Sequence, residues 1–192
     1  MTDAIATGTK TRAQAWDLLC EFTTNKNLRK HGLAVEAAMR AYAEQFEGEA
    51  ELWGMVGLLH DFDYEKYPSL EDHPYKGQEI LKERGYSEVL RQGIMAHAPH
   101  TGTARSTKME KAIFAVDELT GFIVAIALVK PSKTLAEVDV PSVKKKMKQK
   151  GFAAAVSRDD IALGAGELGF TLDEHIHHVL SAMQAIAVEL DL

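Results

Sequence analysis

Apolar residues recur along most of this 192-residue chain at the three- and four-residue spacing of amphipathic α-helices. No stretch shows the strict alternation of a half-buried strand, and the sequence contains no internal repeat. The pattern therefore predicts an all-α protein. The expected helices cover about residues 11–24, 28–46, 49–60, 74–84, 87–96, 107–129, 141–150, 157–168 and 171–189.

Residues that favour helix ends support this division. Ser87 and Ser157 are good N-caps, and Thr171 followed by Glu174 forms a capping box. The acidic and aromatic stretch 61–73 contains a proline and has no helical period, so we expect a loop there. The expected helix over 107–129 is strongly apolar in its second half, which predicts a central position in the fold.

The composition is that of a globular protein. Hydrophobic residues make up 46% of the chain and charged residues 26%, so the chain can bury a sizeable core. The length fits one domain, which we expect to span residues 1–192. The net charge of −6 argues against a broad basic surface for nucleic acid or anionic membranes.

Cysteine usage and hydropathy bear on location. The single cysteine, Cys20, excludes an internal disulfide framework and fits a reducing cytosol. The longest apolar run, 122–129, is far shorter than the roughly 20 residues of a membrane helix. Residues 1–10 lack the features of a signal peptide, and residues 1–9 are expected to fray. We therefore expect a cytoplasmic protein with no membrane partner, and the sequence leaves a homo-oligomer open.

Candidate chemistry centres on His60 and Asp61, which stand side by side at the end of an apolar predicted helix. Buried polar groups are costly unless they are paired or bound to metal. His31 lies on the inward face of the preceding predicted helix, because it is in phase with that helix's apolar positions. Asp117 lies within the long apolar helix downstream, so three helices can converge on one site.

Two further histidines, His73 and His97, lie between Asp61 and Asp117 at predicted helix ends. A lone histidine on an apolar face is usually a core residue, and a His-Asp pair is common by chance. An ordered set of six is far more specific. Imidazole suits Fe, Zn, Ni and Mn, whereas carboxylates shift the preference toward Mn, Fe or Mg. The expected ligands of divalent metal ions are His31, His60, Asp61, His73, His97 and Asp117.

The order His … His-Asp … His … His … Asp resembles the HD-domain superfamily of metal-dependent phosphohydrolases over about residues 28–125. The resemblance implies a single HD-type helical bundle on which C-terminal helices within 141–191 pack. It also implies a site for two ions bridged by Asp61. The first ion would be completed by His31, His60 and Asp117, which with Asp61 form the minimal one-metal set, and the second by His73 and His97.

By the same resemblance, the activity would be hydrolysis of a phosphate ester or anhydride, with a nucleotide or small phosphorylated metabolite as substrate. A metal-bound hydroxide would attack phosphorus, with His60 and Asp61 at the catalytic centre. Some members with this ligand order are mixed-valent di-iron oxygenases. A metal-bound sensing module without turnover is a third hypothesis.

The chain departs from the family pattern just after the His-Asp pair. Many members place a lysine there, whereas this chain has Asp63 and reaches Lys66 only later. A role borrowed for that lysine is therefore in doubt. Asp63 either hydrogen-bonds a ligand histidine or faces solvent, and the sequence favours neither.

Other polar residues are secondary candidates. His100, Arg105 and Lys133 are candidate substrate contacts, since they follow the ligand-bearing stretch and cationic groups bind phosphate. The lysine run 144–150 is most simply a solvated face; a phosphate-binding flap over the site is the sharper alternative, and an RNA contact is disfavoured. Three clustered histidines are interpreted as mostly surface residues: His175, His177 and His178.

Overall fold

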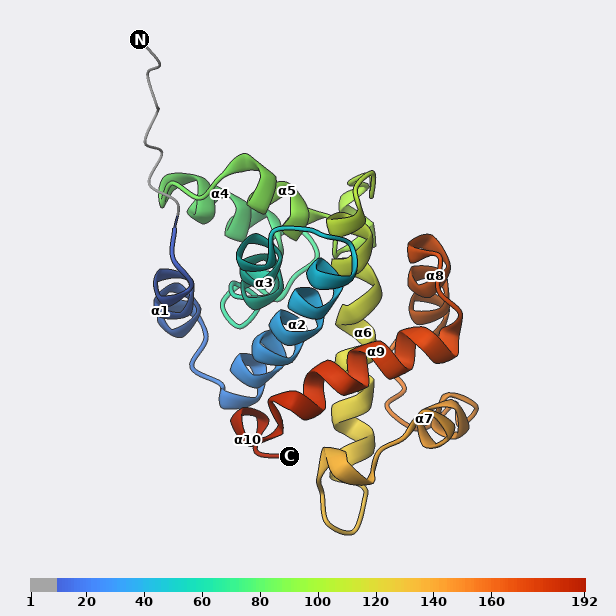
Figure 1. Ribbon diagram of the computed structural model, residues 1–192. Helices are drawn as coiled ribbons and strands as arrows, with labels where there is room; N and C mark the ends of the chain where they lie inside the picture. The colour runs from blue at the N-terminus through green and yellow to red at the C-terminus, as the bar shows by residue number, and fades with distance from the viewer. Residues whose placement is uncertain (1–9) are drawn as a thin grey trace.

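The computed structural model describes residues 10–192, and this part of the chain folds into helices without any β-strand (Figure 1). The all-α prediction is confirmed. The expectations about fraying and a signal peptide at the N-terminus concern residues 1–9, which lie outside the described part. The helices are α1 (Arg12–Phe22), α2 (Lys26–Gln45), α3 (Ala50–Leu59), α4 (Tyr75–Glu83), α5 (Glu88–Met95), η1 (Pro99–Thr101), α6 (Lys108–Leu128), η2 (Leu135–Glu137), α7 (Val140–Met147), α8 (Arg158–Leu168), α9 (Leu172–Ala185) and α10 (Ala187–Leu190).

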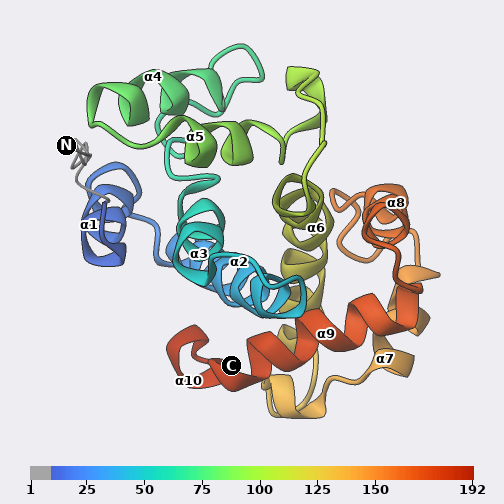
Figure 2. The same cartoon turned by 45° about the horizontal axis from the view of Figure 1, so that its top comes forward.

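The centre of the molecule is formed by α2, α3 and α6. Helix α2 packs against both α3 and α6, and α5 covers α3 and the first half of α6 (Figures 1 and 2). The predicted central position of the second half of α6 is confirmed, because Phe122, Ile123 and Ile126 are fully buried. These three helices carry three of the five segments that reach the candidate site.

The contact between α2 and α3 depends on a glycine. A Cβ atom added at Gly57 would lie 2.8 Å from the carbonyl oxygen of Val35 and 2.9 Å from the backbone nitrogen of Glu36. Only a residue without a side chain allows the two backbones to come this close. The close approach brings the end of α3 beside the first half of α2, and so places His60 next to His31.

Most predicted helix ends agree with the structure. Ser87 and Ser157 cap α5 and α8, and the capping box of Thr171 with Glu174 opens α9. Residues 60–74 form an irregular connection with turns at 60–66 and 70–74, as expected from their composition.

Three boundaries differ from the expectation. Pro74 is the N-cap of α4 rather than a residue of its first turn. Helix α7 begins after Asp139, whose side chain forms a capping box with Ser142, and it ends at Met147. The predicted helix over 171–189 is broken at Ile186 into α9 and α10.

The helices after α6 lie against the central ones. Helix α8 packs on α6, α9 packs on α2 and α6, and α7 packs on α9 (Figures 1 and 2). Within residues 10–192, none of the helices has the length and hydrophobicity that a membrane span requires.

The interpretation of the histidines near residue 177 as surface residues was wrong for His175. Its side chain is fully buried between α9, α2 and α6. Its Nδ1 accepts a hydrogen bond from the Tyr42 hydroxyl at 2.6 Å, and its Nε2–H donates to the Ala115 carbonyl at 3.0 Å. Burial lowers the pKa of His175 to about 4, so the imidazole is neutral. Of the other two, His177 is exposed and His178 is half-buried.

Candidate metal centre

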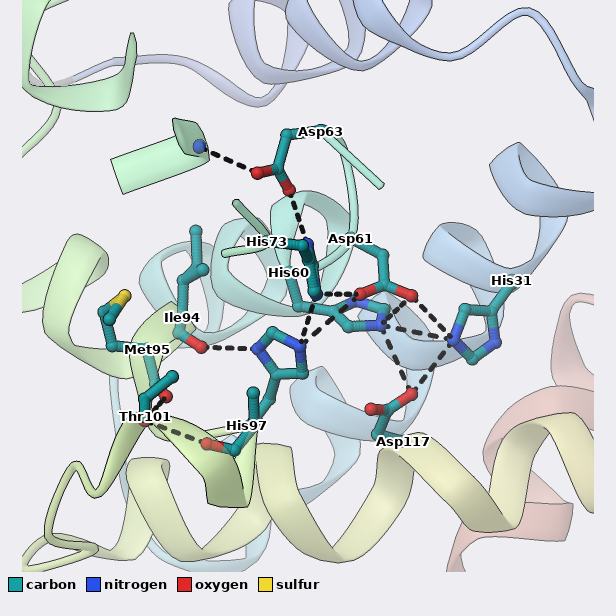
Figure 3. Close-up of polar contacts among 12 residues, drawn as sticks. His31, His60, Asp61, Asp63, His73, Ile94, Met95, His97, Thr101 and Asp117 are labelled. Carbon is teal, nitrogen blue, oxygen red and sulfur yellow. Dashed lines mark hydrogen bonds and ion pairs between the residues drawn. The ribbon is translucent and has the colours of Figure 1, made fainter. Parts of the chain in front are cut away.

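Three helices bring one group of side chains together. His31 projects from α2, His60 stands at the C-terminal end of α3, and Asp117 lies in the middle of α6 (Figure 3). His31 Nε2 lies 3.2 Å from His60 Nε2 and 3.0 Å from Asp117 Oδ1. His60 Nε2 lies 3.3 Å from the same Asp117 oxygen. We call His31, His60 and Asp117, together with Asp61, the first cluster.

A second group forms beside it from two helix ends. His73 lies just before α4, and His97 lies just after α5. Their Nε2 atoms are 3.2 Å apart, and they lie 3.2 Å and 3.4 Å from Asp61 Oδ1. We call Asp61, His73 and His97 the second cluster.

Asp61 belongs to both clusters because its two oxygens face different histidines. Oδ1 faces His73 and His97, whereas Oδ2 lies 3.4 Å from His60 Nε2 and 3.9 Å from His31 Nε2 (Figure 3). The structure therefore brings together all six side chains that the sequence suggested as ligands. Their arrangement is two clusters that share one carboxylate.

The outer nitrogens of three histidines are held by acceptors. His60 Nδ1–H donates to the Gly57 carbonyl at 2.8 Å, and His97 Nδ1–H donates to the Ile94 carbonyl at 2.6 Å. His73 Nδ1–H donates to Asp63 Oδ1 at 2.8 Å. In the neutral imidazole this leaves Nε2 as an unprotonated acceptor that points into the clusters.

The donor set fits divalent metal ions. The converging atoms are imidazole Nε2 atoms and carboxylate oxygens, and such acceptors repel one another unless a proton or metal cation lies among them. Two ligand atoms that are each about 2.1 Å from one ion lie about 3.0–3.4 Å apart at octahedral or tetrahedral angles. The histidine–histidine and histidine–carboxylate separations given above for the clusters fall between 3.0 and 3.4 Å, apart from the 3.9 Å between His31 and Asp61.

The electrostatics favour a cation. Burial lowers the pKa of His73, but hydrogen bonds and negative charge from Asp61 and Asp63 outweigh this and raise it to about 9. Burial also lowers the pKa of His60, and the charges of Asp61 and Asp117 raise it well above its usual range. Burial raises the pKa values of the two cluster aspartates, but the facing histidines hold both well below their usual range. The ionised carboxylates therefore attract protons or metal ions to this site.

Asp63 supports the second cluster, which decides between the two roles left open by the sequence. Its side chain is fully buried, accepts from His73 Nδ1, and accepts from the Gly77 backbone N–H at 2.7 Å. A Cβ atom at Gly77 would lie 2.8 Å from Asp63 Cγ and Oδ2, so the glycine makes room for the carboxylate. Lys66 lies elsewhere, with its ammonium over the Phe22 ring.

The secondary candidates are not gathered at the clusters. His100 Nε2–H donates to the His73 carbonyl at 2.9 Å, so this side chain braces the backbone of a cluster residue. The guanidinium of Arg105 pairs with both oxygens of Glu167 at 2.8 and 2.6 Å and lies over the Phe114 ring. The guanidinium that the sequence offered as a candidate phosphate contact is therefore paired with a carboxylate of this chain. Lys133 is an exposed residue beyond the C-terminal end of α6.

The basic run 144–150 also lies away from the clusters. Figures 1 and 2 place α7 beside α9, whereas α4 and α5, which flank His73 and His97, lie at the other end of α6. Lys144 pairs with Asp173 at 2.7 Å, and Lys146 lies over the Phe152 ring. The position of α7 agrees with a solvated face and not with a flap over the clusters.

Sequence reasoning missed the backbone groups that orient the histidines. The carbonyls of Gly57 and Ile94 each lie three residues before the histidine that they hold. Every residue has a carbonyl, so composition gives no signal for them. The position of each histidine at a helix end was the available clue, because the last carbonyls of a helix lack intrahelical donors.

Comparison with known protein families identifies a match for the part of the chain that carries the two clusters. Residues 28–121 match the family model described as HD domain, and this range contains all six side chains of the two clusters. The searches of curated proteins and of solved structures each gave no significant match.

Proposed function

The chain belongs to the HD domain family through residues 28–121, and from this premise we propose that it is a metal-dependent hydrolase of phosphate esters or anhydrides. The family points to metal-dependent phosphohydrolases. Within that class, we propose a nucleotide or another small phosphorylated metabolite as the substrate. The observation that carries the proposal is the Asp61 carboxylate, whose two oxygens face two separate groups of imidazole nitrogens.

We propose two divalent ions as cofactors, drawn from Fe, Mn, Zn, Ni or Mg. When bound, such ions activate water for attack on phosphorus and offset the negative charge of the phosphoryl oxygens. Asp61 would contribute to both sites. The first site would be completed by His31, His60 and Asp117, and the second by His73 and His97.

The side chains around the site would position the clusters and define the side from which the substrate enters. His60 is fully buried and held by the Gly57 carbonyl, so it fixes the inner side of the first cluster. The side chains of Asp61 and Asp117 are 26% and 22% exposed. These carboxylates mark the side from which a phosphate can reach the clusters. His60 and Asp61 are the residues that we assign to the catalytic centre.

We also propose that the described residues form one domain. Helices α8 and α9 pack directly on α6 and α2, which carry Asp117 and His31. The C-terminal helices therefore support the same helices that hold the first cluster.

The proposal is tested by replacing Asp61. Chelator-treated protein would be reloaded with Mn, Fe, Zn, Ni or Mg and assayed for phosphate release from nucleotides and phosphate monoesters. We expect Asp61→Ala to abolish activity, because it removes a ligand from both clusters. The matched control is Asp159→Ala, which removes an exposed carboxylate at the start of α8. Activity of Asp61→Ala at the unmodified level would refute the assignment.

The same experiment separates the alternatives. If the loaded protein contains iron, consumes oxygen with an organic substrate and releases no phosphate, it is an oxygenase with the same ligand order. If it binds metal and turns over neither class of substrate, the sensing module is supported instead.

A further inference from the structure

A cleft of about 420 Å³ lies beside the first cluster. It is lined by the first two turns of α2, by the second half of α6, and by the end of α10 with the two residues that follow it. We propose that this cleft binds the organic part of the substrate, and that this part is largely apolar. The inference rests on the proposed phosphohydrolase function and narrows its substrate class to phosphate esters with an aromatic or other apolar group.

The cleft shares one residue, His31, with the metal centre. His31 contributes both to the cleft wall and to the first cluster. Gly121, which also lines the cleft, follows Asp117 by one turn of α6. A phosphate held at the first cluster would therefore direct its ester group along α6 into this space.

The wall of the cleft is mainly apolar. Val124 and Leu128 of α6 form one side, and Leu190 of α10 forms another. Leu128 is 51% exposed, so about half of its side chain is open to a ligand in the cleft. The volume lies within the range of about 300–1,000 Å³ that is typical of small-molecule sites, and is larger than a bare phosphate needs.

One ion pair fixes the far wall. Lys30 Nζ lies 2.7 Å from Asp191 Oδ2, which ties the segment after α10 to the first turn of α2. Lys30 is the one lysine or arginine among the residues that line the cleft, and it already pairs with a carboxylate. This favours a neutral apolar group over a polyphosphate chain as the occupant.

Gly121 gives a direct way to fill the cleft. A Cβ atom added there would meet no heavy atom within 4 Å, so a side chain can start at this position of the cleft wall without a clash at its first atom. Gly166 in α8 is a matched control. It is also a helical glycine with no heavy atom within 4 Å of an added Cβ, and it lies outside the cleft.

The experiment compares 1-naphthyl phosphate with ethyl phosphate as substrates of metal-loaded protein. For each variant, the ratio of the two kcat/KM values is measured, so that the different reactivities of the two esters cancel between variants. We expect Gly121→Leu to lower this ratio at least about tenfold, mainly through a higher KM for the naphthyl ester. Gly166→Leu should keep the unmodified ratio.

A binding measurement gives a readout without turnover. Naphthalene-1-phosphonate has no ester bond, and its affinity can be followed by calorimetry. Its Kd should rise about tenfold in Gly121→Leu and stay the same in Gly166→Leu. Leu128→Glu is the second test variant, because the leucine side chain is half exposed and lines the cleft. It should also raise the Kd.

The outcomes separate this inference from the proposed function. If the protein releases phosphate but both cleft variants keep the unmodified ratio and Kd, the cleft inference is overturned. An equal loss on both esters would also overturn it, because the damage would then lie at the metal centre. If no phosphate is released with any metal, yet the phosphonate binds and Gly121→Leu weakens it, the proposed function fails while the cleft stands as a site for apolar ligands.

Discussion

Replacing Gly77 by alanine tests how strongly Asp63 controls the second cluster. The new Cβ would lie 2.8 Å from Asp63 Cγ and Oδ2, whereas carbon atoms in contact are about 3.5–4.0 Å apart. The carboxylate must therefore retreat by about 0.7 Å or more. Asp63 Oδ1 accepts a hydrogen bond from His73 Nδ1 at 2.8 Å. After the retreat, this distance would approach the longest that a hydrogen bond allows.

The expected consequence is weaker metal binding at the second cluster only. Losing a hydrogen bond that orients a ligand histidine costs about 10- to 100-fold in metal affinity. This corresponds to about 1.4–2.7 kcal/mol. The first cluster does not contact Asp63, so its affinity should be unchanged.

The assay is titration calorimetry of chelator-treated protein with Mn²⁺, with thermal melting to confirm folding. Gly166→Ala is the control, because the same change in an open part of α8 meets no atom within 4 Å. It should leave both affinities unchanged and stabilise the fold by about 0.4–1 kcal/mol. Two ions bound to Gly77→Ala with unmodified affinity would refute the role given to Asp63.

Two further predictions concern other histidines. His73→Ala should lose one metal ion per chain and keep the other, as measured by elemental analysis, whereas the exposed His177→Ala should keep both; unchanged stoichiometry in His73→Ala would reduce the site to one ion. The pKa of His175 is lowered to about 4 by burial, so the unfolded chain, with a value near 6.5, takes up a proton at mildly acidic pH that the folded chain does not. This contribution to stability is complete above pH 6.5 and is lost as the pH falls toward 4, by about 2 kcal/mol between pH 7 and pH 5. Urea unfolding at pH 7 and pH 5 gives the free energy of unfolding at each pH. Between the two pH values this free energy should fall by about 2 kcal/mol more in the unmodified protein than in His175→Gln. An equal fall in both proteins would contradict the prediction.

The helices, and the six side chains that gather in the two clusters, were accessible from the sequence because each has a local signal. Helical periodicity and caps such as Ser157 act within a few residues of the chain. The six side chains lie at helix ends or on apolar faces. The order of residues typical of the family, together with helices that converge in a bundle, was therefore enough to predict that they come together.

Other features depended on contacts between distant segments. His175 is buried because Tyr42 lies opposite it, 133 residues earlier in the chain, and periodicity along α9 alone cannot reveal that partner. The pairing of Arg105 with Glu167 spans 62 residues. This ion pair engages the guanidinium that the sequence offered as a candidate phosphate contact, and composition alone cannot reveal that partner.

The most direct test of the metal centre is the metal content per chain, measured by elemental analysis on protein purified without chelator or a nickel-leaching tag. About two ions per chain in the unmodified protein, and a loss of both in Asp61→Ala, are expected from a carboxylate that faces two clusters. No bound metal after reconstitution with Mn, Fe, Zn, Ni or Mg would contradict the account. Two ions retained by Asp61→Ala would contradict it equally.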